Sequence, residues 1–272
     1  GEVYSQPDTI WTRAISNGSR PLEVIQTFEG GFAIGGAAWG GDRERMDSDF
    51  SVIKTSYLGF LDWREFYTLV PDTLYQTERV YALEQMMDRG FVLCGQGPGG
   101  GGMIVRTDSV GQMLWSRHYD NHQVFVDCSL TAGDNILTVH ANSVARKIDL
   151  EEGEIIWERG YAIEGSGTLW NVTSTMDGGF LLTGRISSIG EGGNDMYAVK
   201  IDTDGEVEWY NTYGTEEYGE SITNAVQTAD GGFCMVGYSY RDQRHNYGMI
   251  VRTESGGEEL WRRIFIDNED NM

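Results

Sequence analysis

The stretch KIDTDGEVEW, residues 200–209, contains the glycine and the tryptophan that decide the fold of this 272-residue chain. Six of the eight tryptophans recur at spacings of 52, 52, 42, 52 and 52 residues: Trp11, Trp63, Trp115, Trp157, Trp209 and Trp261. A glycine stands four residues before each of the last five, as Gly205 does before Trp209. Such regular spacing indicates that the chain is built from internal repeats.

A second signature lies upstream of the tryptophan in each unit. It reads EGGFAIGG (29–36), DRGFVLCG (88–95), DGGFLLTG (177–184) and DGGFCMVG (230–237), and the third unit has the degenerate GDNILTVH (133–140). Each unit contains four short runs rich in Val, Ile, Phe and Tyr, separated by glycine and aspartate turns, which is typical of β-strands. No segment has a sustained apolar period of 3.6 residues, so we expect few helices.

Units of 42–52 residues with four antiparallel strands each predict the blades of a β-propeller. We therefore predict an all-β chain that forms a single β-propeller domain over residues 1–272. Five blades are expected, at about 20–67, 76–119, 123–161, 168–213 and 220–266. The tryptophan of each fourth strand is expected to pack between adjacent blades, where a large flat side chain fills the widening gap.

One further strand is predicted before the first blade, at Ile10–Ile15 (IWTRAI). It has two interpretations. In the first, which we favour, it closes a ring of five blades by pairing in the last blade, because closure buries sheet edges and blade faces. In the second, it belongs to a sixth, shared blade that needs a partner or a longer parent protein.

The repeats resemble two kinds of known protein. The stretch IDLEEGEIIW (148–157) resembles the tryptophan-docking repeat of pyrroloquinoline-quinone-type propellers. The DGGF units, with DMYAVKIDTDGEVEWYNTYG (195–214), resemble secreted bacterial repeat proteins built from DGGF and VKxDxxGxxxW blades. The quinone enzymes of this fold class usually have eight blades and often an adjacent cysteine pair, neither of which this chain has. The resemblance therefore implies a cofactor-free, extracytoplasmic propeller.

Asp202 and Asp204 in KIDTDGEVEW have the spacing of the first ligands of a calcium loop. The sister hairpins do not repeat this pair, and Tyr213 stands where such a loop needs a bidentate glutamate. We therefore interpret these aspartates as turn residues. The glycine run GQGPGGGG (95–102) lacks the lysine and the helix of a phosphate-binding loop, so we predict an ordinary loop. No metal site and no cofactor is expected.

Charge and composition disfavour several classes of function. The net charge of -22 and the pI near 4.4 argue against nucleic acid and anionic lipid as partners. No apolar run approaches the ~18 residues of a membrane helix, so we expect no direct membrane insertion. Cys94, Cys128 and Cys234 lack metal-type spacing, and the equivalent Cys94 and Cys234 are predicted to be buried thiols. The chain has no GxSxG and no HExxH, so no catalytic residue is predicted.

The connections between the second and third strands of the blades vary most in length and sequence. Variable loops on one face of a rigid scaffold predict a binding surface there. The aromatic and acidic residues in or near these loops are its expected members: Trp39, Asp42, Asp47, Tyr238 and Tyr240. Trp170 is expected to join them from the strand after a connection between two blades, since such connections emerge on the same face.

These observations favour a non-enzymatic, extracytoplasmic propeller that binds a protein partner. It would act as an interaction scaffold or as an accessory subunit of an envelope complex. The alternative is a carbohydrate-binding or carbohydrate-active propeller, in which Trp39, Tyr238 and Tyr240 stack on the sugar rings of a glycan. A quinone or metal enzyme is a third and less favoured hypothesis.

Overall fold

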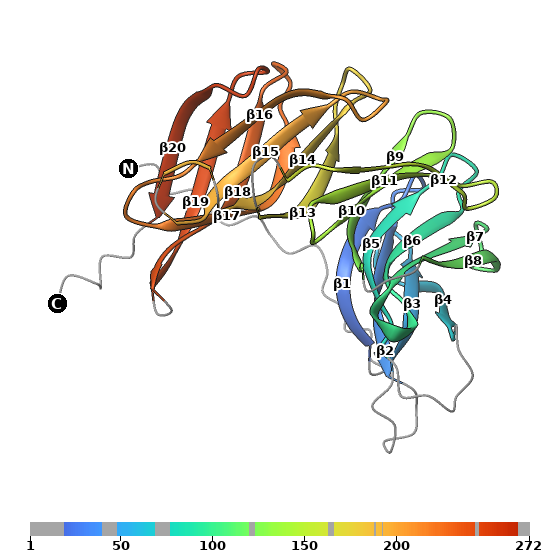
Figure 1. The fold of residues 1–272 in the computed structure, drawn as a ribbon. Coiled ribbons are helices and arrows are strands. Elements are labelled where there is room, and N and C mark those ends of the chain that lie inside the picture. Colours follow the sequence, from blue (N-terminus) through green and yellow to red (C-terminus); the bar gives the residue numbers. More distant parts are fainter. Residues whose placement is uncertain are drawn as a thin grey trace.

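The computed structural model describes residues 19–39, 48–68, 77–119, 123–162, 166–187, 189–191, 193–242 and 245–265. Within these residues the chain forms twenty strands and one short 3-10 helix, η1 (Pro98–Gly100). The strands make five separate four-stranded antiparallel sheets, which confirms the predicted five-bladed, all-β architecture (Figure 1). The strand predicted at Ile10–Ile15, and the loop residues Asp42 and Asp47, lie outside the described residues.

Each sheet is one blade, with its strands in simple chain order. The first blade contains β1 (Ser19–Gln26), β2 (Phe32–Trp39), β3 (Ser48–Thr55) and β4 (Leu61–Tyr67). The second contains β5 (Arg79–Gln85), β6 (Phe91–Gln96), β7 (Gly102–Thr107) and β8 (Met113–Tyr119). The third contains β9 (Phe125–Thr131), β10 (Asn135–His140), β11 (Val144–Asp149) and β12 (Ile155–Gly160).

The fourth blade contains β13 (Gly167–Ser174), β14 (Phe180–Ile186), β15 (Asp195–Ile201) and β16 (Val207–Tyr213). The fifth contains β17 (Gly219–Gln227), β18 (Phe233–Asp242), β19 (His245–Thr253) and β20 (Glu259–Phe265). None of the helical structure in the described ranges is long and apolar enough to cross a membrane.

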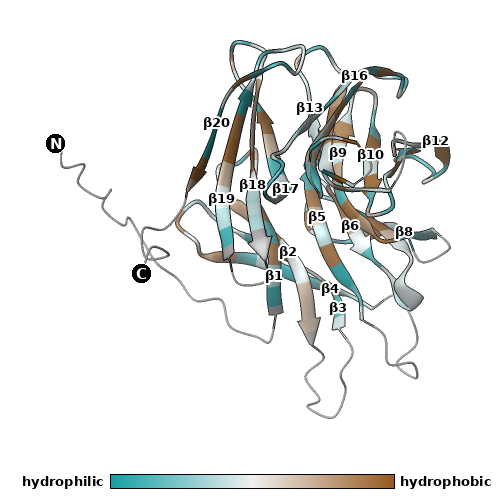
Figure 2. Ribbon diagram, turned by 60° about the vertical axis from the view of Figure 1, so that its left-hand side comes forward, coloured by the Kyte–Doolittle hydropathy of each residue, from teal (hydrophilic) through white to brown (hydrophobic). Residues whose placement is uncertain are grey.

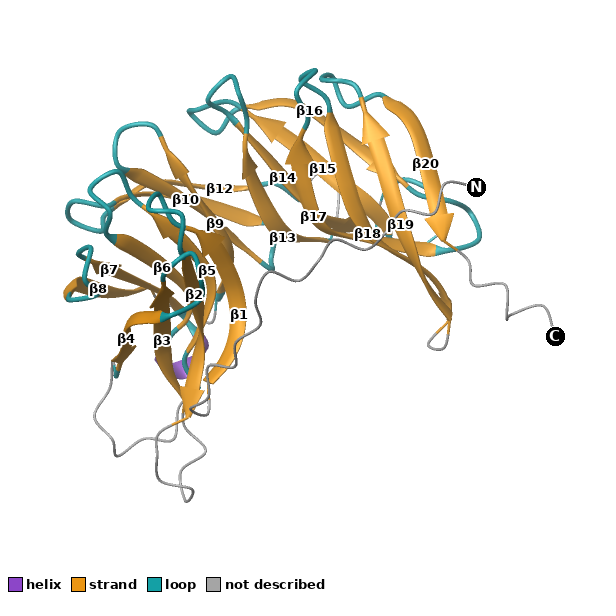
Figure 3. Ribbon diagram, turned by 180° about the vertical axis from the view of Figure 1, so that it is seen from behind, coloured by secondary structure: helices purple, strands orange, loops and turns teal. Residues whose placement is uncertain are grey.

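The blades follow one another along an arc, and the first strand of each blade lies on the inner side (Figures 1 and 3). Consecutive first strands pack together: β1 on β5, β5 on β9, β9 on β13 and β13 on β17. Among the described residues, no comparable packing joins the fifth blade to the first. The favoured ring closure depends on Ile10–Ile15 and so stays a prediction.

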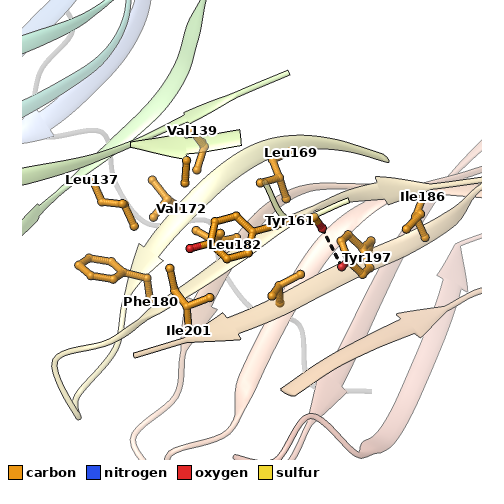
Figure 4. Close-up of a cluster of buried hydrophobic side chains, with 12 residues drawn as sticks. Leu137, Val139, Tyr161, Leu169, Val172, Phe180, Leu182, Ile186, Tyr197 and Ile201 are labelled. Carbon is orange, nitrogen blue, oxygen red and sulfur yellow. Dashed lines mark hydrogen bonds between the residues drawn. The ribbon is translucent and has the colours of Figure 1, made fainter. Parts of the chain in front are cut away.

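The hydrophobic core is divided into four clusters, one between each pair of consecutive blades. Figure 2 shows the hydrophobic residues concentrated in middle strands such as β10 and β19. Between the third and fourth blades, Leu137 and Val139 face Val172 and Leu182 (Figure 4). A blade is therefore stable only as one of a stack, because each sheet buries its apolar face on the next sheet.

The repeated tryptophan makes the contact between blades that the sequence predicted. Each tryptophan lies against the hairpin glycine of the following blade: Trp63 on Gly111, Trp115 on Gly153, Trp157 on Gly205 and Trp209 on Gly257. A Cβ on Gly205 would lie 2.8 Å from the indole of Trp157, and the φ of Gly205 is +81°. Glycine is required at these hairpins both by the positive φ and by the close approach of the ring.

A tyrosine four residues after the tryptophan completes this contact, and the sequence analysis did not predict its role. Its hydroxyl donates to the carbonyl of the same glycine: Tyr67 to Gly111 (2.8 Å), Tyr119 to Gly153 (2.7 Å), Tyr161 to Gly205 (2.8 Å) and Tyr213 to Gly257 (2.7 Å). The fifth blade has Phe265 at this position. Its Trp261 and Phe265 are 46% and 55% exposed, so the far face of the fifth blade is uncovered in the described structure.

The tyrosine contact can be tested by exchanging phenylalanine and tyrosine at equivalent positions. Tyr213→Phe should lower the free energy of unfolding by about 1 kcal/mol, because it leaves the buried carbonyl of Gly257 without its donor. The matched control, Phe265→Tyr, adds a hydroxyl at an exposed position and should change stability little. Urea unfolding followed by tryptophan fluorescence measures both, and equal effects of the two substitutions would contradict the assignment.

Candidate functional site

The first strands of all five blades line one cavity of about 430 Å³ on the inner side of the arc, which we call the axial cavity. Each of these strands carries a register shift beside the cavity, between Pro21 and Glu23, Val80 and Ala82, Phe125 and Asp127, Leu169 and Asn171, and Ile222 and Asn224. A β-bulge of this kind turns one side chain out of the alternation of the strand. The bulges thus place polar residues against the cavity from β1, β9, β13 and β17.

Three carboxyl groups from consecutive blades lie at the axial cavity: Glu23 on β1, Glu84 on β5 and Asp127 on β9. Burial, followed by the nearby charge of Asp127, raises the pKa of Glu84 to about 7. Burial also raises the pKa of Asp127 to about 7 and that of Glu23 in the same direction. The charge on Glu23 raises the pKa of both of the others. The cluster therefore holds protons near neutral pH.

Asp127 has a structural role as well. Its carboxylate accepts hydrogen bonds from the backbone N–H of Cys128 (2.8 Å) and of Val172 (2.8 Å). The Nδ2 group of Asn171 donates a third (2.7 Å). Two of these donors belong to the fourth blade, so Asp127 ties the third blade to the fourth. Glu84 and Glu23 are then the carboxylates better able to contact a ligand.

Aromatic side chains complete the wall of the axial cavity. Trp170 stands at the bulge of β13 and is 37% exposed, and Tyr81 stands at the bulge of β5. An aromatic face beside carboxylates is suited to an organic cation, which the ring quadrupole and the negative charges both attract. The same combination of ring, carboxyl and amide groups also suits a sugar.

The predicted binding residues are found in different places. Trp170 lines the axial cavity, whereas Tyr238 and Tyr240 lie on β18 and do not line it. The rings of Tyr238 and Tyr240 are 6.0 Å apart and tilted by 41°. The hydroxyl of Tyr240 accepts a hydrogen bond from Asn194 of the fourth blade. Trp39 ends β2, but its side chain, like Asp42 and Asp47, is outside what the structure describes.

The sequence analysis missed most of the residues around the axial cavity. They are Glu23, Tyr81, Glu84, Asp127, Asn171 and Asn224. A signal did exist, because all six lie in the first strand of a blade and several follow the bulge directly. Aligning the five first strands would have shown an acidic or amide residue directly after the bulge in four blades. The second blade has Ala82 at this position.

The aspartates of KIDTDGEVEW act as the turn residues that the sequence predicted. The Oδ1 atom of Asp202 accepts hydrogen bonds from the backbone N–H of Asp204 (2.9 Å) and of Glu206 (2.9 Å). In the part of the chain that the structure describes, no group of three or more His, Cys, Asp or Glu side chains is arranged to hold a metal ion.

The raised pKa of Glu84 predicts how stability depends on pH. A carboxyl group whose pKa is higher in the folded state than in the unfolded state destabilises the fold as the pH rises from the lower pKa to the higher one. For Glu84 this range runs from about 4.5 to about 7. Glu84→Gln should remove this loss and raise the free energy of unfolding at pH 8 by about 3 kcal/mol, with no gain at pH 4.

Urea unfolding at pH 4, 6 and 8 measures this effect. The control is Asp204→Asn, which changes an exposed carboxylate in the hairpin of the fourth blade and should give the wild-type pH profile. If Glu84→Gln and wild type have parallel profiles, the proposed protonation of Glu84 is wrong.

Comparison with known proteins identifies the fold. No family model matches this chain, and no curated protein matches its sequence. A protein of unknown function from Bacteroides caccae is similar over 95% of this chain and 85% of its own, with 14% identity and a TM-score of 0.62.

Two solved propellers are also similar. The Dos1 propeller matches over 93% of this chain and 59% of its own, with 11% identity and a TM-score of 0.57. The Cps50 (Swd1) β-propeller domain of Myceliophteria thermophila matches over 93% and 88%, with 12% identity and a TM-score of 0.51. At such low identity these likenesses show the fold alone, and the fold is a β-propeller of four-stranded blades.

Proposed function

We propose that this protein is a non-enzymatic, extracytoplasmic scaffold that binds a protein partner and holds a lysine or arginine side chain of that partner in the axial cavity. The observation that carries the proposal is the cavity itself, with Glu23, Glu84 and Trp170 on its wall. An accessory subunit of an envelope complex is the form of scaffold that we favour.

The electrostatics of the cavity support a cationic ligand. The neighbouring charges that act on Glu84 are those of Asp127 and Glu23, and both are negative. A cation that enters the cavity would displace the protons of these carboxyl groups and relieve their mutual repulsion. The net charge of -22 would also steer a basic partner surface toward the protein from a distance.

Trp170 supplies the second element of the proposed site. A partly exposed tryptophan in a concave site is the kind of residue that carries much of the binding energy at protein interfaces. Its strand is tied to the third blade, since the neighbouring Asn171 and Val172 donate to Asp127. A ring held on a rigid strand loses little conformational entropy when a partner binds.

Model peptides test the proposal directly. The probes are fluorescent Gly-Ser peptides that carry a single central arginine, lysine or glutamate. We expect the arginine and lysine peptides to bind and the glutamate peptide not to bind. Glu84→Gln and Trp170→Ala should each weaken binding about tenfold, and binding should weaken further at high salt.

Asp204→Asn is the matched control, because it removes one exposed negative charge from the hairpin between β15 and β16, which does not line the axial cavity. It should leave peptide affinity unchanged. Equal binding of the glutamate and arginine peptides, or an equal effect of Asp204→Asn and Glu84→Gln, would count against the axial cavity as the site.

A carbohydrate-binding or carbohydrate-active propeller is the second candidate function. It is favoured by the pKa of Glu84, which burial and the charge of Asp127 raise to about 7, as in a general acid that protonates a glycosidic oxygen. Trp170 would then stack on a sugar ring. A glycan array and a hydrolysis assay separate this function from the first, since a scaffold for a basic peptide should neither retain nor cleave neutral glycans.

The extracytoplasmic location is part of the same proposal. Its support is the resemblance of the DGGF repeats to those of secreted bacterial proteins. Fractionation of the source cells, followed by immunoblotting, tests it: the protein should be found in the periplasmic, surface or secreted fraction, and recovery with the cytoplasmic marker would contradict it.

A further inference from the structure

Two of the three cysteines meet between the second and third blades. Cys94, on β6, is fully buried, and Cys128, on β9, is 5% exposed. Both belong to the hydrophobic cluster that joins these blades, β6 packs on β9, and the neighbouring Cys94 thiol contributes to the raised pKa of the Cys128 thiol. All three cysteines are free in this structure. Two neighbouring thiols from separate sheets are placed to form one covalent link.

The axial cavity borders this pair. Cys128 is one of the residues that line the cavity, while Cys94 is packed behind it in the cluster. An oxidant in the cavity would therefore reach Cys128 first. Cys94 would then be the neighbouring thiol that resolves the intermediate.

We propose that Cys94 and Cys128 form a redox pair, which a small disulfide oxidises through the axial cavity to a disulfide bond between the second and third blades. This inference is independent of the proposed function. The two positions are not equivalent in their blades, because Cys94 lies on a second strand and Cys128 on a first strand.

The chemistry is a double thiol–disulfide exchange. The thiolate of Cys128 attacks one sulfur of the disulfide R–S–S–R, the S–S bond breaks, and R–S⁻ leaves with the proton that Cys128 lost. The thiolate of Cys94 then attacks the Sγ atom of Cys128 and releases the second R–S⁻, which takes the proton of Cys94. Two protein thiols are oxidised, and one small disulfide is reduced to two thiols.

The surroundings of the pair set the rate of this exchange. Burial and the contact with Cys94, followed by the charges of Glu84 and Asp127, raise the pKa of the Cys128 thiol. The thiolate is therefore scarce at neutral pH, and exchange should accelerate as pH rises. The carboxylates should also favour a cationic disulfide over an anionic one in the cavity.

Cys234 provides an internal control. It lies on β18 two residues before Val236, which holds the position of Cys94 on β6, so it points to the same side of its strand; no following blade covers that face in the described part of the chain. It has no cysteine partner equivalent to Cys128. Oxidation of the pair should therefore leave one free thiol of the three.

The test treats the folded protein with cystamine, a cationic disulfide, or with dithiodiglycolate, an anionic one. After alkylation, peptide mass mapping should show a crosslink between the peptides of Cys94 and Cys128 and alkylated Cys234. Cystamine should act about tenfold faster. The crosslink should raise the unfolding midpoint by about 5 to 10 °C, reversibly with dithiothreitol, because it restricts the unfolded chain.

Variants assign the effect to the pair. Cys94→Ser and Cys128→Ser should each abolish the crosslink and the thermal shift, and Cys234→Ser should retain both. Mapping of the wild-type protein decides the question even if a serine variant does not fold. The proposal is overturned if all three thiols stay free, if Cys128 stops at the mixed disulfide, or if Cys234 enters the crosslink. Equal rates with the two disulfides would overturn the axial route.

Discussion

The contact between the tryptophan of one blade and the hairpin glycine of the next is the interaction on which the rest of the structure depends. It has a direction, because the indole of Trp157 lies on Gly205 while Tyr161 donates to the carbonyl of the same glycine. A blade therefore offers a tryptophan on one face and a glycine hairpin on the other. Repetition of this contact stacks the blades in one order, and that order brings five first strands together around a common cavity. The cavity is thus a consequence of contacts made at the other end of each sheet.

The same contact explains why the fold could be predicted from the sequence. Position 205 requires glycine for two reasons: its φ is +81°, and a Cβ there would collide with the ring of Trp157. The size of the gap between adjacent blades requires a side chain as large as tryptophan. Both requirements act within one repeat, so they leave a periodic signal. The role of Tyr161 was not predicted, because its acceptor is a backbone carbonyl in the following blade. Every residue has such a carbonyl, so the sequence does not show which one accepts the hydrogen bond.

The axial cavity was harder to predict for two physical reasons. Its residues come from five repeats, so their proximity depends on how the blades are placed rather than on any local pattern. The bulges add a second obstacle, because they break the two-residue alternation that assigns a side chain to a face. Trp170, which was expected near the loop face because its strand follows the connection from the third blade, stands at such a bulge and lines the cavity. The proximity of Cys94 and Cys128 was missed for the first reason, since comparing the repeats sets Cys94 beside Cys234, which stands in the same apolar run of another blade.

The acidic lining of the cavity works against the stability of the fold. Burial and mutual repulsion raise the pKa values of Glu84 and Asp127, so each charge that forms above neutral pH lowers the free energy of unfolding. Hydrophobic residues of similar size would fill these positions at lower cost, although the charge of Asp127 holds three donors and Glu84 accepts a backbone hydrogen bond from Leu130. A cation held in the cavity would offset the penalty in the folded state only, so binding and blade stability are thermodynamically linked. Burial is the main cause of the raised pKa of the Cys128 thiol, and the charges of Glu84 and Asp127 add to it, so a cation that compensates these charges would lower that pKa.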